Sequence, residues 1–270
     1  MHPKLGILAG GGELPRLLIQ ACREAGRDVF VIAFKGQCDP QTTEAVDHAW
    51  VRLGASGTSI ALLKNNGVEE LVMAGRISRP SVTALMPDVR TVRFLAGGFF
   101  NKGDDGLLRG IIKTLEEDEG FRFVGVHNVM PELLTPEGPI GSIAPTEADT
   151  QDIQAATRAA KHLGAADLGQ AAVCLGGQTI ALEDRDGTDA MLHRLIEGGM
   201  ARGGILAKMC KPGQERRADL PAIGLTTVEN AHKAGLKGIV VEAGASVIVR
   251  RAEVAALADE KGLFVVGIKS

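Results

Sequence analysis

Residues 4–34 read KLGILAGGGELPRLLIQACREAGRDVFVIAF, and this stretch decides the fold. It begins with a short apolar run that ends in glycines, continues through a helical pattern and closes with a second apolar run. Such alternation is typical of two buried parallel strands joined by a right-handed helical crossover. The alternation continues through the first half, which predicts a Rossmann-like, doubly wound parallel sheet in an α/β fold.

The composition changes in the middle of the chain. Residues 131–149, PELLTPEGPIGSIAPTEAD, contain four prolines and show no sustained periodicity, which is typical of a linker. We place the domain boundary near Ile143, so that residues 1–143 form the Rossmann-like domain and residues 144–270 a smaller mixed α/β domain. In the second domain, Gly176 and Gly177 lie between two apolar runs and predict a β-hairpin.

Composition and charge restrict the class of protein. Hydrophobic residues make up 45% and charged residues 23%, as in soluble globular proteins. A net charge of −3 and 3% aromatic residues argue against nucleic acid as a partner. The four cysteines form no CxxC pair, so we expect free buried thiols in a reducing cytoplasm. The sequence contains no run of about 18 apolar residues, so it predicts no membrane span.

Three glycines, Gly10, Gly11 and Gly12, separate the first strand from the first helix. Glycines there let the backbone approach a ligand, and the N-terminus of the helix favours an anion. The dinucleotide fingerprint requires a further glycine where this chain has Pro15, and an acidic residue after the second strand is missing. The turn therefore predicts either a phosphate- or nucleotide-binding site or only a tight turn, and it disfavours a full NAD site.

Charged residues follow the strands and precede the helices of the first half. Asp104 and Asp105 stand at the start of a predicted helix, where carboxylates either cap the helix or bind Mg²⁺. Arg76 and Arg79 come just after a predicted strand, where ligands bind in parallel sheets, and paired arginines suit a phosphate. In the second half, Thr188 and Asp189 begin another predicted helix, either as an ordinary cap or as substrate contacts.

The polar loop KPGQERRADLPAIG, residues 211–224, follows a buried-looking strand that contains Lys208. It is either a solvated connector or a binding loop for a charged ligand. Pro212 and Pro221 restrict the backbone at both edges. Rigid presentation of lysine, arginine, glutamine and carboxylate side chains favours placement of a metal-bound diphosphate, so Lys208 and four loop residues are candidates for the site. The four are Lys211, Gln214, Arg217 and Asp219.

Several motifs together resemble one known family. They are LGILAGGGELP, GRISRP, GDDGLLR, GVHNVMPELLTPEGPIG, DLGQAAV, GTDAML, AKMCKPGQERRADLPAIG, VEAG and GLFVVGI. In this order they span nearly the whole chain, and they resemble the bacterial UDP-2,3-diacylglucosamine pyrophosphatases of the LpxI type. At one position the chain departs from the family pattern KPGQDxRxD, because residue 215 is Glu. This departure puts Glu215 in doubt as a metal ligand and favours Asp219.

The resemblance implies a lipid A pathway enzyme of the cytoplasm that contacts the inner membrane peripherally. Its reaction would hydrolyse UDP-2,3-diacylglucosamine to 2,3-diacylglucosamine 1-phosphate (lipid X) and UMP, with water attacking the phosphorus on the sugar side. It would need Mg²⁺ or Mn²⁺, held by Asp219 with Asp104 or Asp105, while Lys208, Lys211 and Arg217 offset charge on the phosphoryl oxygens. We expect a homodimer.

Two alternatives remain at the level of the sequence. One is an NAD(P)-dependent oxidoreductase built on the glycine turn, and the other is a non-catalytic protein that binds a nucleotide sugar or lipid. The residue that accepts the proton of the attacking water is left open.

Overall fold

The computed structural model describes residues 2–78, 85–96, 103–199 and 201–269, which fall into two compact units. The N-terminal unit comprises Met1–Pro131 and Glu215–Asp219, and the C-terminal unit comprises Glu132–Gln214 and Leu220–Ser270. Residues 132–143, the part of the predicted linker that precedes the proposed boundary, lie in the C-terminal unit. Five residues of the polar loop, Glu215–Asp219, belong to the N-terminal unit.

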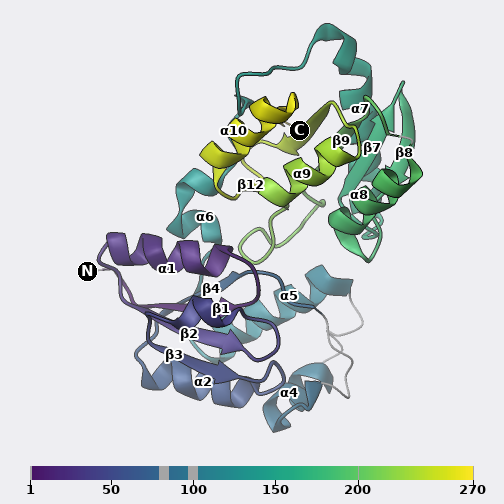
Figure 1. The fold of residues 1–270 in the computed structure, drawn as a ribbon. Helices are drawn as coiled ribbons and strands as arrows, with labels where there is room; N and C mark the ends of the chain where they lie inside the picture. Colours follow the sequence, from purple (N-terminus) through teal and green to yellow (C-terminus); the bar gives the residue numbers. More distant parts are fainter. Residues whose placement is uncertain (1, 79–84, 97–102, 200, 270) are drawn as a thin grey trace. The chain divides into compact units, whose positions relative to one another are not determined.

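A five-stranded parallel sheet forms the centre of the N-terminal unit (Figure 1). Its order is β3-β2-β1-β4-β5, with all neighbouring strands parallel. The strands are β1 (Leu5–Ala9), β2 (Val29–Phe34), β3 (His48–Val51), β4 (Glu70–Ala74) and β5 (Arg122–Phe123). The helices are α1 (Leu14–Glu24), α2 (Ser56–Asn65), α4 (Val89–Ala96), α5 (Gly103–Lys113) and α6 (Val126–Val129). A 3-10 turn covers Pro40–Thr43, and a π-helical turn, Thr114–Asp118, continues α5.

Helices cover both faces of this sheet, α1 on one side and α2 on the other (Figure 1). Leu18 and Cys22 of α1 are buried and stand four residues apart, so one stripe of the helix faces the sheet. On the opposite face, Leu63 of α2 and Ile112 of α5 pack in one cluster with Leu71 and other strand residues. Burial on both faces explains why β1 is apolar throughout, with all five of its residues buried.

The C-terminal unit contains a six-stranded mixed sheet in the order β6-β13-β11-β9-β7-β8. Its strands are β6 (Gly138–Pro139), β7 (Ala171–Leu175), β8 (Gln178–Leu182), β9 (Ile205–Lys208), β11 (Gly238–Glu242) and β13 (Phe264–Ile268). The helices are α7 (Thr150–Ala165), α8 (Gly187–Gly198), α9 (Leu225–Lys233) and α10 (Arg251–Lys261). Short 3-10 turns cover Pro131–Leu133 and Glu147–Asp149, and β10 (Ala222–Ile223) pairs with β12 (Val247–Ile248) in a separate parallel ribbon.

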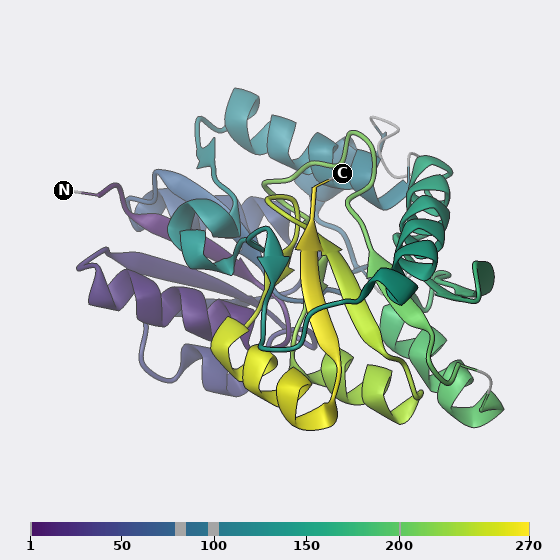
Figure 2. The same ribbon diagram turned by 90° about the horizontal axis from the view of Figure 1, so that it is seen from above.

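Strand residues of this sheet alternate between two cores. Leu206 and Val241 pack in one cluster with α8, α9 and α10, whereas Ala207 and Val240 pack in another cluster with α7. Figure 2 shows α9 and α10 lying side by side along one face. The period-2 alternation places helices on both faces, as the apolar runs indicated.

The structure confirms the α/β class, with a parallel sheet in one unit and a mixed sheet in the other. The predicted hairpin is also confirmed, since β7 and β8 are antiparallel and Gly176 and Gly177 have positive φ angles. The segment predicted as a linker supplies a strand, because β6 pairs antiparallel with β13. All four cysteines are buried and free, as expected.

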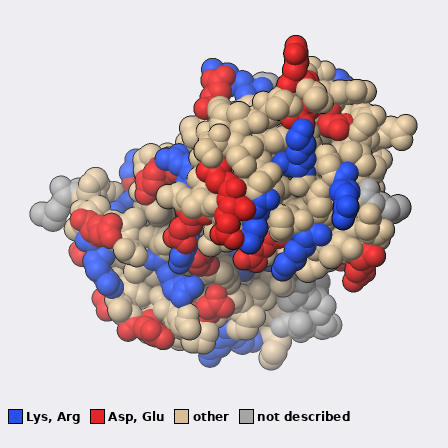
Figure 3. All heavy atoms as spheres, turned by 45° about the horizontal axis from the view of Figure 1, so that its top comes forward, with Lys and Arg blue, Asp and Glu red and all other residues tan. Residues whose placement is uncertain are grey.

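None of the described helices has both the length and the apolar character that a membrane span requires. On the face that Figure 3 shows, basic and acidic side chains of the described residues are intermixed.

Candidate functional site

The glycine turn after β1 lets two backbone segments approach closely. The N–H of Gly11 donates to the carbonyl of Arg76 at 2.8 Å, and the N–H of Arg76 donates back to Gly11 at 2.9 Å. A Cβ on Gly10 would lie 2.3 Å from the carbonyl oxygen of Arg76. Gly12 has a φ of +90°, a conformation that L side chains rarely adopt. The close backbone approach at Gly10 and Gly11 and the positive φ of Gly12 therefore explain why glycine stands at these three positions, without any ligand.

A carboxylate of the protein already bonds to this turn. The N–H of Gly12 donates to Oδ2 of Asp39 at 2.8 Å. An amide of the turn is thus bonded to a carboxylate side chain of the same unit, and whether the turn also binds a phosphate or nucleotide stays a prediction. A phosphate at this amide would have to replace Asp39.

Arg76 and Arg79, the two arginines predicted to contact phosphate, follow β4. Arg76 is exposed and its backbone forms the bridge to Gly11. Arg79 lies outside the described residues. Their joint role stays a prediction.

Asp104 and Asp105 both stand in the first turn of α5, as predicted. The side chain of Asp104 lies outside the described residues. Both oxygens of Asp105 are engaged: Oδ2 accepts from Nη2 of Arg109 at 2.5 Å, and Oδ1 accepts from the N–H of Glu215 at 2.8 Å. Asp105 therefore anchors the polar loop to α5 within the N-terminal unit.

Glu215–Asp219, hereafter the loop turn, is a single helical turn organised by Glu215. The carbonyl of Glu215 accepts the N–H groups of Ala218 and Asp219, each at 3.0 Å. Asp219 is half-buried at the end of this turn. The backbone of Glu215 thus fixes where the chain presents Asp219.

The side chain of Glu215 forms a two-point ion pair with Arg217. Nε of Arg217 donates to Oε1 at 2.9 Å, and Nη2 donates to Oε2 at 3.0 Å. These hydrogen bonds hold the pKa of Glu215 below its ordinary value although burial opposes the shift, and they raise the pKa of Arg217. Glu215, whose role was in doubt, is therefore a structural partner of Arg217 in this conformation.

A second carboxylate holds the same arginine. Nη1 of Arg217 donates to Oε1 of Glu116 at 2.8 Å, and this oxygen also accepts the N–H of Phe123 at 3.1 Å. Glu116 stands in the π-helical turn after α5. These contacts with the two carboxylates use three of the five N–H groups of the guanidinium, so a phosphate would bind to an arginine that the protein already holds in place.

His127 lies near the loop turn, at the start of α6. A Cβ on Gly125 would touch the ring of His127 at 2.4 Å and the Cα of Arg217 at 3.2 Å. Burial, with a smaller contribution from Arg216, lowers the pKa of His127, which keeps the ring neutral at neutral pH. Its Nδ1 is buried and has no hydrogen-bond partner among the described residues.

The remaining loop candidates lie at the carboxyl end of β9 in the C-terminal unit. Nζ of Lys208 donates to the carbonyl of Ala222 at 3.1 Å. Nζ of Lys211 pairs with Asp167 at 2.8 Å. Carboxyl ends of parallel strands are where ligands bind in α/β sheets, so the position of these lysines agrees with the predicted site.

Gln214 supports the loop from inside. It is buried, and its Oε1 accepts the N–H of Lys211 at 2.9 Å. The buried carboxylate of Glu242, at the end of β11, accepts the N–H of Cys210 at 2.9 Å. These two contacts support the start of the loop. In the sequence, only the two prolines had indicated that the loop is restricted.

Thr188 and Asp189 lie in the first turn of α8. The hydroxyl of Thr188 is buried and donates to Oε1 of Glu183 at 2.6 Å. Asp189 is an acidic residue at a helix N-terminus, where the helix dipole favours it. Both positions thus have an ordinary structural role, and their contact with substrate stays a prediction.

Mg²⁺ takes oxygen ligands and commonly needs only one or two protein carboxylates in addition to substrate phosphates. In the part of the chain that the structure describes, no three His, Cys, Asp or Glu side chains come together as a metal site. Asp219 is a half-buried carboxylate at the end of the loop turn, and one carboxylate is compatible with an ion that a diphosphate also coordinates. Asp105 fits less well because its oxygens are engaged.

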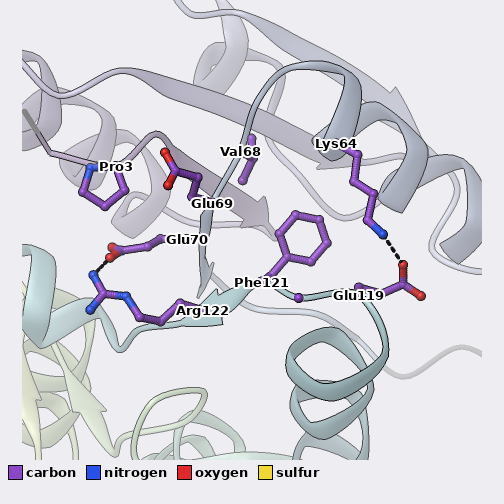
Figure 4. A pocket seen from close by; sticks show the side chains of 9 residues that line it. Pro3, Lys64, Val68, Glu69, Glu70, Glu119, Phe121 and Arg122 are labelled. Carbon is purple, nitrogen blue, oxygen red and sulfur yellow. Dashed lines mark hydrogen bonds and ion pairs between the residues drawn. The ribbon is translucent and has the colours of Figure 1, made fainter.

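A pocket of about 440 Å³ lies elsewhere in the N-terminal unit, at the amino ends of β4 and β5 (Figure 4). None of its lining residues is a predicted site residue. Glu70 pairs with Arg27 and Arg122, and Glu119 pairs with Lys64 and Arg90. Two of the three acidic side chains that line this pocket, Glu70 and Glu119, are thus paired with basic side chains of the protein.

The structure therefore brings Asp105 together with Arg217 and the backbone of Asp219, through Glu215. Inspection of the sequence did not select Glu116, His127 or Glu242. Two of them could have been selected, because His127 and Glu242 lie in the family-like motifs GVHNVMPELL and VEAG. Glu116 had no signal, because its partner lies 101 residues away.

Comparisons with known proteins cover nearly the whole chain. The sequence model of the LpxI N-terminal domain matches residues 4–133, and that of the LpxI C-terminal domain matches residues 136–266. The UDP-2,3-diacylglucosamine pyrophosphatase LpxI of Caulobacter vibrioides is 42% identical over 274 residues, which covers 98% of this chain and 97% of that protein.

Proposed function

The chain belongs to the LpxI family, and we propose from this that it hydrolyses UDP-2,3-diacylglucosamine to 2,3-diacylglucosamine 1-phosphate and UMP in lipid A biosynthesis. The observation that carries the proposal is the identity of 42% over almost the full length of a protein named for this activity. Family membership does not favour the oxidoreductase alternative.

Asp219 is the proposed catalytic carboxylate. Its position at the end of the loop turn, fixed by the carbonyl of Glu215, supports a role that requires accurate placement. Lys208, Lys211 and Arg217 are the proposed partners of the phosphoryl oxygens, where their positive charges would stabilise the transition state. Gln214 orients Lys211 through the backbone contact described above.

Arg217 would bind the substrate while the protein holds it in place. Glu215 holds its guanidinium in the same planar, two-point manner in which arginine binds phosphate, and Glu116 adds one further hydrogen bond. The carboxylates keep the group extended and aligned, which reduces the conformational entropy lost on binding.

Mg²⁺ or Mn²⁺ is the proposed cofactor, held by Asp219 and by the diphosphate of the substrate. Such an ion supplies Lewis-acid polarisation of a phosphoryl oxygen. Asp104 remains a proposed second ligand, whereas Asp105 has the structural role already described. Water is proposed to attack the phosphorus on the sugar side.

We propose that the enzyme works in the cytoplasm, as a homodimer that contacts the inner membrane peripherally. Support for membrane contact comes from α4 and the residues before it, where Met86, Val89 and Val92 are exposed large apolar side chains. Arg93 lies on the same short helix, as does Arg90, which pairs with Glu119. Exposed apolar groups beside a basic side chain are found on surfaces that bind an anionic lipid interface.

The N-terminal unit is proposed to be Rossmann-like, which its all-parallel order and helices on both faces support. Its glycine turn and Arg76 are the proposed contacts for the nucleotide, together with Arg79.

The proposal is tested by turnover of UDP-2,3-diacylglucosamine with and without EDTA. We expect wild-type protein to release UMP, EDTA to abolish the release, and Asp219→Asn to lower kcat by at least about 10²-fold with unchanged Tm. A wild-type rate in the variant would show that Asp219 is not catalytic. Unchanged turnover in EDTA would show that no removable metal takes part.

A further inference from the structure

We propose that Glu116 is a positioning residue for Asp219, which it controls through Arg217 and Glu215. The inference rests on the proposed catalytic role of Asp219 and adds a residue that neither the motifs nor the family comparison selects.

Glu116 is held firmly at its own end. Its Oε1 accepts the backbone N–H of Phe123 at 3.1 Å, which ties the side chain to β5 in the parallel sheet. It stands in a π-helical turn, and such turns often occur where a helix re-aims a side chain at a functional site. Glu116 therefore presents a fixed negative charge from the rigid part of the N-terminal unit.

From this fixed point, contacts lead to Asp219 without a gap. Glu116 accepts from Nη1 of Arg217 at 2.8 Å, and Arg217 grips both carboxylate oxygens of Glu215. The carbonyl of Glu215 then accepts the N–H of Asp219 at 3.0 Å. Asp105 is a second tether of the same turn, because its Oδ1 accepts the N–H of Glu215 at 2.8 Å. Loss of the Glu116 link therefore leaves the loop turn held at Glu215 only, which should loosen the turn and shift Asp219.

The exposed fractions of the Glu116 and Arg217 side chains indicate that their ion pair can position the loop turn without contributing much to the stability of the fold. The side chains of Arg217 and Glu116 are 36% and 30% exposed, so their ion pair is partly hydrated. Partly hydrated pairs contribute little to folding. Loss of the Glu116 charge should therefore affect the loop turn and leave the fold intact.

Glu116→Gln is the direct test, because glutamine keeps an oxygen for the N–H of Phe123 and replaces the charged bond to Arg217 by a weaker neutral one. We expect kcat for UDP-2,3-diacylglucosamine to fall about 10-fold or more, with KM and Tm nearly unchanged. Glu117→Gln is the matched control, since Glu117 is the next residue, is 66% exposed and pairs only loosely with Lys113 at 3.7 Å. The control should keep wild-type kcat. Wild-type kcat in Glu116→Gln, or equal losses in both variants, would overturn the proposal.

A second measurement needs no substrate, and so separates this inference from the proposed function. Hydrogen exchange followed by mass spectrometry should show faster exchange at the amides of Ala218 and Asp219 in Glu116→Gln and no change in Glu117→Gln. Exchange that stays protected in Glu116→Gln contradicts the positioning role, whether or not the protein hydrolyses the substrate. Faster exchange across the whole N-terminal unit would also contradict it, by showing a general loss of stability.

A double-mutant cycle with Arg217→Lys completes the test. If Glu116 acts through Arg217, the double variant should lose no more kcat than the worse single variant. Losses that multiply in full would mean that the two residues act independently, and would overturn the proposed route.

Discussion

Gly10 leaves no space for a side chain, because a Cβ there would lie 2.3 Å from the backbone oxygen of Arg76. The neighbouring backbone cannot rotate away as a side chain could. The glycine turn is thus required by the approach of two chain segments, whatever it binds.

Gly10→Ala should accordingly lower the free energy of unfolding by about 1–3 kcal/mol through overpacking. Gly224→Ala is the control, since the nearest atom to its Cβ would lie at 3.9 Å and its backbone is extended. Urea unfolding of both variants measures the difference. A Gly10→Ala protein as stable as wild type would mean that the close approach does not restrict this position.

At the scale of single residues, the sequence indicated which polar side chains are candidates for the site, but it did not indicate their hydrogen-bond partners. Lys211, Arg217 and Asp219 were selected from the residue types of one loop. The structure shows hydrogen bonds that support this loop from Gln214 and Asp105. Glu116 could not be predicted, since nothing local distinguishes it from Glu117. Only the fold brings it to Arg217.

At the scale of secondary-structure elements, one buried carboxylate, Asp149, joins the turn before α7 to Lys237. Oδ1 of Asp149 accepts from Lys237 at 2.5 Å, and Oδ2 accepts the N–H of Thr146 at 2.7 Å. Burial alone would raise the pKa of Asp149, but the hydrogen bonds from Lys237 and Thr146 outweigh burial and lower the pKa below 3.8. The carboxylate therefore stabilises the folded state when it is ionised.

Because the folded pKa is the lower one, this stabilisation is complete above about 3.8 and is lost as pH falls through the folded value. Asp149→Asn should cost about 1–3 kcal/mol at neutral pH, and the cost should shrink in acid. Asp184→Asn is the control, because Asp184 is 52% exposed. Denaturant titrations across pH measure both. A cost for Asp149→Asn that stays constant into strong acid would contradict the account.

Elements with strong apolar patterns were predicted well, and weak ones were not. β1, β2, β11 and β13 are buried runs that follow the pattern closely. β3 was not predicted, because it is a short edge strand whose first residue is an exposed histidine. β6, in the proline-rich segment, was not predicted either, because a strand of two residues at the edge of a sheet has no periodic hydrophobic pattern.

For the whole molecule, the exposed apolar residues of α4 give the proposed membrane contact a location. Val89 and Val92 are three residues apart, so they share one side of the helix. Replacement of both by glutamate should weaken binding to phosphatidylglycerol vesicles about 10-fold or more, by loss of apolar burial and by charge repulsion.

Leu168→Glu is the matched control, because Leu168 is equally apolar and 61% exposed but lies in the C-terminal unit. Co-sedimentation with vesicles, compared with hydrolysis of a short-chain soluble substrate, separates membrane binding from chemistry. Equal vesicle binding by all three proteins would show that α4 is not the contact surface.

The most direct test of the central claim is hydrolysis of UDP-2,3-diacylglucosamine in ¹⁸O-labelled water, followed by mass spectrometry of both products. The account predicts that wild-type protein releases UMP without label and 2,3-diacylglucosamine 1-phosphate carrying one ¹⁸O, because water attacks the phosphorus on the sugar side. Label in UMP would contradict the proposed point of attack. Absence of both products from well-folded protein supplied with Mg²⁺ would contradict the proposed function itself.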